Sequence, residues 1–181
     1  MSNLEDAADG GDAVAAENLK ALSELTVEEK QRLAEYLKGG FESEFDNSVS
    51  EEQGDVRVTT SRERSSWGTS TKYISVRTYV TFINVKVMET QVTGIYEVGN
   101  GRVNRVLAHT CNVTRNYDLF SQVTTEKTGS YVSGNQASFL CNVTVKRGAP
   151  TPWGPISWST RSATQFAVGN SRGHVVNSGW M

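Results

Sequence analysis

The feature that most constrains the fold of this chain is a long alternation of apolar and polar residues between Tyr73 and Val98. Its first half carries four apolar residues of one parity, which are Ile74, Val76, Val80 and Phe82. This spacing is typical of a β-strand with one buried face. The apolar residues then change to the opposite parity at Ile83, which predicts a bulge or bend near Phe82 and Ile83.

Strands are also predicted for the rest of residues 56–181, because Val, Thr, Ser, Tyr and Ile dominate and turn residues recur at intervals. Asn100-Gly101 is a strong hairpin signal. Further strands are expected near residues 103–115, 119–126, 136–147, 155–168 and 172–180. The loops expected between them are 126–129, 133–135, 147–154 and 168–173. The pattern predicts an all-β body, an antiparallel β-sandwich of about eight strands.

The segment before this body is predicted to be partly helical. Residues 1–14 hold little that can be buried, and we expect them to be disordered. Residues 15–38 are expected to be helical, with a second helix at Thr26, which forms a capping box with Glu29. Residues 41–55 are acidic and rich in serine, so we expect a linker. Such short helices are marginal alone, and we expect them to dock on the body or on a partner.

Two glycines, Gly39 and Gly40, follow the predicted second helix. They supply a helix stop. An acidic helix followed by Gly-Gly, over residues 22–40, also resembles the double-glycine leader of exported peptide bacteriocins. Leu37 matches the apolar position of that family four residues before the cut, while two other positions carry smaller or charged residues. The resemblance implies cleavage after Gly40 and makes the N-terminal segment a leader or acidic propeptide.

Charge is divided unevenly along the chain. Residues 1–55 hold 15 acidic and 4 basic side chains, a net charge of −11. Residues 56–181 hold 5 acidic and 14 basic side chains, a net charge of +9. Such asymmetry indicates binding to a polyanion or masking by an acidic tail. We therefore treat the chain as an acidic N-terminal segment, residues 1–55, and a basic body, residues 56–181.

The two cysteines, Cys111 and Cys141, each begin the sequence Cys-Asn-Val-Thr. By strand parity Cys141 faces the core with Phe139 and Val143, and Cys111 does so with Leu107 and Val113, while the Asn and Thr residues point outward. Two states remain open on this pattern. The cysteines form a disulfide if their strands are neighbours, or they are two buried thiols.

Tryptophan and arginine residues are the candidates for a surface-binding site. Trp67 lies close to Arg62 and Arg64, Trp153 lies in a proline-rich loop, and Trp180 is near the end of the chain. Tryptophan beside basic side chains suits a membrane interface or a sugar ring. The alternative is that these tryptophans cover the ends of the core.

The chain is not predicted to be an enzyme. The body holds two histidines, and the sequence shows no phosphate-binding glycine loop, nucleophile elbow or metal-ligand cluster. His109 is expected to be a packed or edge histidine, and His174 lies in a turn-to-strand segment. We therefore expect no catalytic residues, no metal and no cofactor.

These observations favour a cationic, toxin-like or bacteriocin-like β-sandwich that acts at an anionic membrane or cell envelope and is masked by its acidic segment. One alternative is a self-assembling structural protein, an oligomer in which the acidic helix docks on a neighbouring basic sheet. Another is a glycan-binding module, and nucleic acid is the least favoured partner. No apolar run has the length of a transmembrane segment. We expect secretion without a classical signal peptide, with the cytoplasm as the alternative location.

Overall fold

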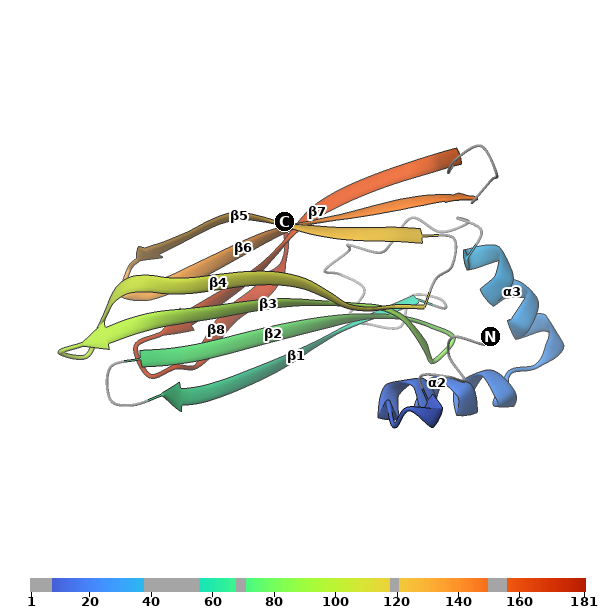
Figure 1. Ribbon diagram of the computed structural model, residues 1–181, viewed down its shortest axis with the longest axis horizontal. Coiled ribbons are helices and arrows are strands. Elements are labelled where there is room, and N and C mark those ends of the chain that lie inside the picture. The colour runs from blue at the N-terminus through green and yellow to red at the C-terminus, as the bar shows by residue number, and fades with distance from the viewer. Residues whose placement is uncertain (1–7, 38–55, 68–70, 118–120, 150–155) are drawn as a thin grey trace.

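The computed structural model describes residues 8–37, 56–67, 71–117, 121–149 and 156–181 (Figure 1). Its helices are α2 (Ala13–Glu24) and α3 (Val27–Leu37). One antiparallel sheet contains, in this order, β1 (Val56–Trp67), β2 (Thr71–Phe82), β3 (Val85–Gly99) and β4 (Arg102–Asn116). The other contains β5 (Ser121–Ser133), β6 (Gln136–Ala149), β7 (Ile156–Asn170) and β8 (Val175–Trp180). The expectation of a mostly β body after a helical segment is confirmed.

Tight two-residue turns join several neighbouring strands. Asn100-Gly101 and Gly134-Asn135 have positive φ at both residues, as type I′ hairpin turns require. Both turns agree with the prediction. Ile83-Asn84 has the same geometry, with φ of 44° and 64°, so the parity change there is a chain reversal, which was not predicted. The sequence signal for this turn was weak because β-branched residues rarely adopt positive φ. A register shift between Val80 and Thr81 of β2 lies next to this turn, so a bulge is present close to the predicted position.

Bulges account for two other differences from the prediction. The loop expected at residues 126–129 is absent, because β5 continues through it with a register shift between Lys127 and Gly129. In β4, Leu107 was expected to face the core, but it is 45% exposed. The register of β4 with β3 shifts beside it, from Ile95 opposite Ala108 to Tyr96 opposite Val106. An extra residue in one strand moves the side chains beyond it to the opposite face of the sheet.

The main core lies between the two sheets. It takes its fully buried residues from both, chiefly Ile74, Val76, Val92, Tyr96, Ala137, Phe139, Cys141 and Ala167. A Cβ atom added at Gly94 of β3 would overlap the ring of Phe139 from β6, so this glycine allows the sheets to approach closely. The Tyr96 hydroxyl donates a hydrogen bond to the carbonyl of Asn170 in β7 at 2.7 Å. Burial raises the pKa of Tyr96 to about 12.

A second apolar cluster lies where the helices meet the sheets. Its buried residues are Leu33 of α3, Val80 and Phe82 of β2, Val85, Val87 and Met88 of β3, and Val145 of β6. Ala21, Leu22 and Leu25 pack against it. Figure 1 shows α2 and α3 together at one end of the sheets, beside the β2–β3 turn. The helices thus cover an apolar end of the body, as the docking prediction required.

The helix ends follow local chemistry. The Thr26 amide donates to Glu29 Oε2 at 2.8 Å, and the Glu29 amide donates to Thr26 Oγ1 at 3.2 Å, which confirms the capping box. Helix α2 begins at Ala13, within the stretch that was expected to be disordered, because Asp12 caps it. In the described part of the chain, neither helix combines the length and the apolar content needed to cross a membrane.

Candidate functional site

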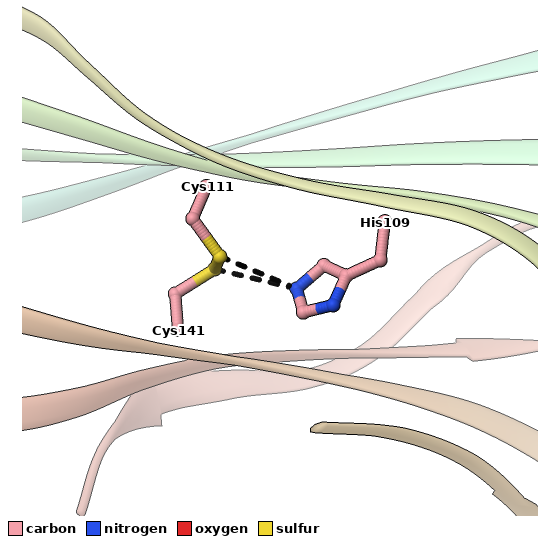
Figure 2. A group of neighbouring side chains, drawn as sticks. All are labelled: His109, Cys111 and Cys141. Carbon is pink, nitrogen blue, oxygen red and sulfur yellow. Dashed lines mark hydrogen bonds between the residues drawn. A yellow bond between two sulfur atoms is a disulfide. The ribbon is translucent and has the colours of Figure 1, made fainter. Parts of the chain in front are cut away.

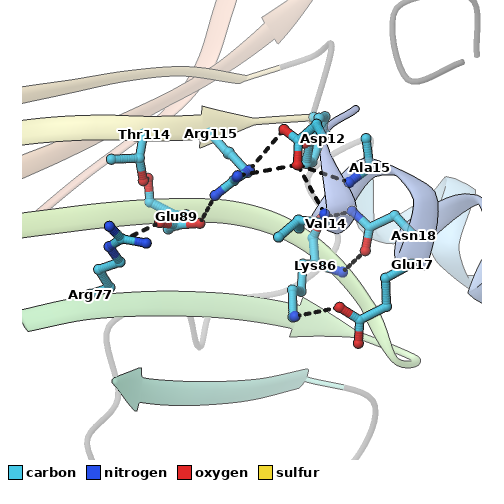
Figure 3. Close-up of polar contacts among 11 residues, drawn as sticks. Asp12, Val14, Ala15, Glu17, Asn18, Arg77, Lys86, Glu89, Thr114 and Arg115 are labelled. Atoms are coloured by element: carbon cyan, nitrogen blue, oxygen red, sulfur yellow. Dashed lines mark hydrogen bonds and ion pairs between the residues drawn. The ribbon is translucent and has the colours of Figure 1, made fainter. Parts of the chain in front are cut away.

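The acidic segment is held to the body by a chain of charged groups centred on Arg115 of β4 (Figure 3). Arg115 donates hydrogen bonds to both carboxylate oxygens of Asp12 at 3.2 Å and to Glu89 of β3 at 2.5 Å. The side chain of Glu89 is 2% exposed, and its other oxygen lies 3.9 Å from Nε of Arg77. Acidic and basic groups therefore alternate from Asp12 to Arg77 on the face of one sheet.

Asp12 has two roles at this contact. Its Oδ1 atom accepts hydrogen bonds from the amides of Val14 and Ala15, at 2.9 and 3.3 Å, and so caps α2. The hydrogen bond from Arg115 lowers the pKa of Asp12, burial opposes this, and the two amides lower it further. Burial alone would lower the pKa of Arg115, but its bonds to Asp12 and Glu89 raise it above the usual value. Both groups therefore stay charged around neutral pH.

Lys86, just after the β2–β3 turn, makes the second contact with α2. Asn18 is 1% exposed, and its side-chain amide donates to the Lys86 carbonyl at 2.8 Å and accepts from the Lys86 amide at 3.0 Å. Asn18 thus satisfies both backbone groups of one residue, as a neighbouring strand would. The Lys86 ammonium lies 2.8 Å from Glu17 Oε2 and 5.3 Å from the centre of the Tyr79 ring.

A second group of chemically active side chains lies between the sheets. Cys111 of β4 and Cys141 of β6 form a disulfide with a Cα–Cα distance of 5.7 Å, which resolves the two states that the sequence left open. Figure 2 shows the His109 ring pointing at this bond, with Nε2 3.4 Å from each sulfur. His109 also packs on Phe139, with 5.6 Å between ring centres. It is the packed histidine that strand parity predicted.

An open pocket of about 810 Å³ lies beside His109. Residues 106–110 of β4 and 127–130 of β5 line it. Two hydrogen bonds made by residues outside this lining tie β4 to the other sheet and its β5–β6 turn. The Val103 amide donates to Asn135 Oδ1 at 2.8 Å, and the Thr125 hydroxyl donates to the Cys111 carbonyl at 3.0 Å. Burial lowers the pKa of His109, and the positive charge of Lys127 lowers it further. The imidazole is therefore neutral and within reach of solvent.

The predicted surface-binding residues are not brought together among the described side chains. Trp180 is 5% exposed, so its prediction as a surface residue is wrong. It lies in β8, opposite Gln165 of β7, and belongs to the core. Arg62 is exposed, and its Nε donates to Ser178 Oγ at 3.2 Å, which links β1 to β8.

Several other predictions fall outside what the structure describes. Gly39, Gly40 and Trp153 lie outside the described residues. For Trp67 and Arg64, the backbone belongs to β1, but the side chains are not described. Cleavage after Gly40 and binding through these side chains therefore stay predictions.

Sequence reasoning missed the residues that join the two parts of the chain. Asn18 interrupts an apolar helical face formed by Ala15, Leu22 and Leu25, and a polar residue in such a position is a usable signal of a specific contact. Asp12 precedes the helix as a good N-cap residue. Its pairing with Arg115, 103 residues away, has no signal in the sequence.

Comparison of the chain with protein-family models, with curated proteins and with solved structures gave no match in any of the three. The contacts of the described residues therefore carry the functional conclusion by themselves.

Proposed function

We propose that the protein is a non-enzymatic, cationic β-sandwich that binds an anionic membrane or cell-envelope surface, and that its acidic N-terminal segment masks the body until it is released. The observation that carries this proposal is the docking of the acidic helices on their own body. Asp12 and Glu17 pair with Arg115 and Lys86, which are basic groups of the body.

The docked segment covers apolar surface as well as charge. Leu33 is 6% exposed, and Leu22 and Leu25 pack on the same cluster at the end of the sheets. Phe82 and Met88 belong to the same buried cluster as Leu33, so release of the helices would remove the helical side of this cluster, close to Lys86. Apolar side chains beside basic ones are the combination that binds interfacial lipid when the headgroups are anionic. Masking and membrane binding therefore use the same surface, which supports the proposal.

The test compares two full-length variants with the same change in charge. Asp12→Lys with Glu17→Lys reverses the two acidic groups that contact the body. Glu28→Lys with Glu35→Lys is the control, since these residues lie on α3, where both side chains are exposed. Each protein is mixed with phosphatidylglycerol or phosphatidylcholine vesicles, and binding is measured by flotation and leakage by release of a trapped dye.

We expect the first variant to bind phosphatidylglycerol vesicles at least about tenfold more tightly than the control, which corresponds to about 1.4 kcal/mol. Binding should weaken as salt is added, because exposed charges are screened. Equal binding by the two variants contradicts masking. Absence of binding by both, with anionic lipid present, contradicts the proposed function.

Self-assembly, the alternative, would use the same contacts between two chains instead of within one. Measurement of the molecular mass in low and high salt separates the two functions. A monomer at every salt concentration counts against assembly, whereas a dimer that dissociates with salt and with the Asp12→Lys, Glu17→Lys substitutions supports it.

A further inference from the structure

Three side chains that can bind a metal ion meet between the sheets. The sulfurs of Cys111 and Cys141 and a ring nitrogen of His109 all lie within 4.8 Å of one another. The nitrogen is 3.4 Å from each sulfur. In a tetrahedral zinc site, bonds of about 2.3 Å to sulfur and about 2.0–2.1 Å to nitrogen place these two kinds of ligand about 3.5 Å apart. His109 therefore already stands at the right distance from both sulfurs.

We propose that reduction of the Cys111–Cys141 disulfide converts this group into a binding site for one Zn²⁺ ion, held by His109, Cys111 and Cys141. The two sulfurs must separate to about 3.8 Å on a tetrahedral ion. Because the Cα atoms are 5.7 Å apart, rotation of the two side chains is enough. The ion would then join β4 to β6 in place of the covalent bond.

The reduction is an ordinary thiol–disulfide exchange with a dithiol. A thiolate of the dithiol attacks one cysteine sulfur, breaks the S–S bond and forms a mixed disulfide. The other cysteine leaves as a thiolate at this step. The second thiol of the dithiol then attacks the dithiol's own sulfur in the mixed disulfide, which releases the first cysteine and leaves the dithiol oxidised. The protein gains two electrons and two protons as two thiol groups, and both protons are released when Zn²⁺ binds the thiolates.

The surroundings of His109 suit this role. A histidine binds metal through a ring nitrogen, and Nε2 of His109 already points at the two sulfurs (Figure 2). The two thiolates balance the charge of Zn²⁺, so the ion and its three ligands together carry no net charge. Partial burial of this neutral group therefore costs little, and it does not repel the positive charge of Lys127 nearby. The pocket lined by residues 106–110 and 127–130 borders His109. It gives the ion a route of entry and leaves a fourth coordination position for water.

The test uses the full-length chain in its oxidised and reduced forms, with excess reductant removed under anaerobic conditions. Zn²⁺ is titrated against a coloured chelator, and Co²⁺ replaces it to report thiolate ligands through charge-transfer absorption. We expect one ion per reduced chain and none at this site in the oxidised chain. His109→Ala should weaken binding at least about tenfold, a loss in the range found when the support of a metal ligand is removed.

His174→Ala is the matched control, because it removes the other histidine of the chain, and binding should stay unchanged. Circular dichroism follows the fold of each reduced protein. The proposal is overturned if the reduced chain keeps its sheets but binds no Zn²⁺, or if it loses its sheets and Zn²⁺ does not restore them. It is also overturned if His109→Ala binds as tightly as the unaltered chain, or if Co²⁺ shows no thiolate charge transfer.

Discussion

Replacement of Glu89 by glutamine tests whether the buried carboxylate holds the charged chain together. Glu89 lies between Arg115, at 2.5 Å, and Arg77, at 3.9 Å, and its side chain is 2% exposed. Glutamine keeps the size of the side chain and one carbonyl acceptor. The substitution therefore removes the negative charge with little change in packing.

The expected loss of stability follows from burial. Removal of one partner from a fully buried ion pair costs about 3–5 kcal/mol, because the other charge is left uncompensated. Here the side chains of Arg115 and Arg77 are 25% and 34% exposed, so water replaces part of the lost interaction. Asp12 also still pairs with Arg115. We therefore expect Glu89→Gln to lower the free energy of unfolding by about 2–3 kcal/mol, less than for a fully buried pair.

The assay is urea unfolding of the disulfide-bonded, full-length chain, followed by tryptophan fluorescence and circular dichroism. A loss of this size lowers the melting temperature by about 4–12 °C for a chain of this length. Glu97→Gln is the control, since Glu97 pairs with Arg105 at 3.0 Å but the two side chains are 31% and 69% exposed. Exposed pairs contribute little, so the control should unfold close to the unaltered protein.

Equal midpoints for the two variants, with equal dependence on urea, would refute the reasoning. Such a result would mean that burial of Glu89 does not strengthen its ion pairs. A change in the urea dependence would instead indicate a changed denatured or native state. In that case, the variants are compared by the free energies of unfolding extrapolated to zero urea and not by the midpoints.

Three further predictions follow from single contacts. Gly94→Ala places a methyl group in the ring of Phe139 and should cost about 1–3 kcal/mol in urea unfolding, part of which Phe139→Leu should restore. Tyr96→Phe removes the hydrogen bond to the Asn170 carbonyl and should cost about 0.5–1.5 kcal/mol by the same measurement. Arg115 holds the pKa of Asp12 below its usual value of 3.8. The contribution of this ion pair to docking is therefore complete above pH 3.8, and it is lost as the pH falls through the lowered pKa of Asp12. The protection of the α2 amides, relative to their intrinsic exchange at each pH, should therefore fall in acid. Asp12→Asn, which keeps a capping side chain, should lose the part of this pH dependence contributed by Asp12. Protection that is independent of pH in both proteins would contradict this.

Local rules predicted much of the secondary structure. In β6, the alternation from Ala137 to Val145 placed the buried residues correctly, since each strand residue faces opposite to its neighbours. Asn100-Gly101 predicted a turn, because both residues tolerate positive φ. The capping box of Thr26 and Glu29 is equally local. Such features depend on residues close in the chain, so the sequence alone is enough.

Prediction failed where pairing with another strand decided the outcome. Thr128-Gly129 was expected to be part of a loop, but pairing with β6 carries β5 straight through it. Leu107 was expected inside, and a bulge against β3 turns it outward. In both cases, the hydrogen bonds of the partner strand outweigh the local preference, as is usual for β-structure.

The candidate site shows the same division. The sequence alone determined three features: an acidic segment, a basic β body, and two cysteines whose positions in their strands place them on the core side. Only the tertiary structure decided that Cys111 and Cys141 meet across two sheets beside His109, and that Asp12 reaches Arg115. The physical reason is that charge and strand parity depend on the residue and its neighbours, whereas these contacts depend on which strands pack together. That choice is made by burial of apolar surface over the whole molecule.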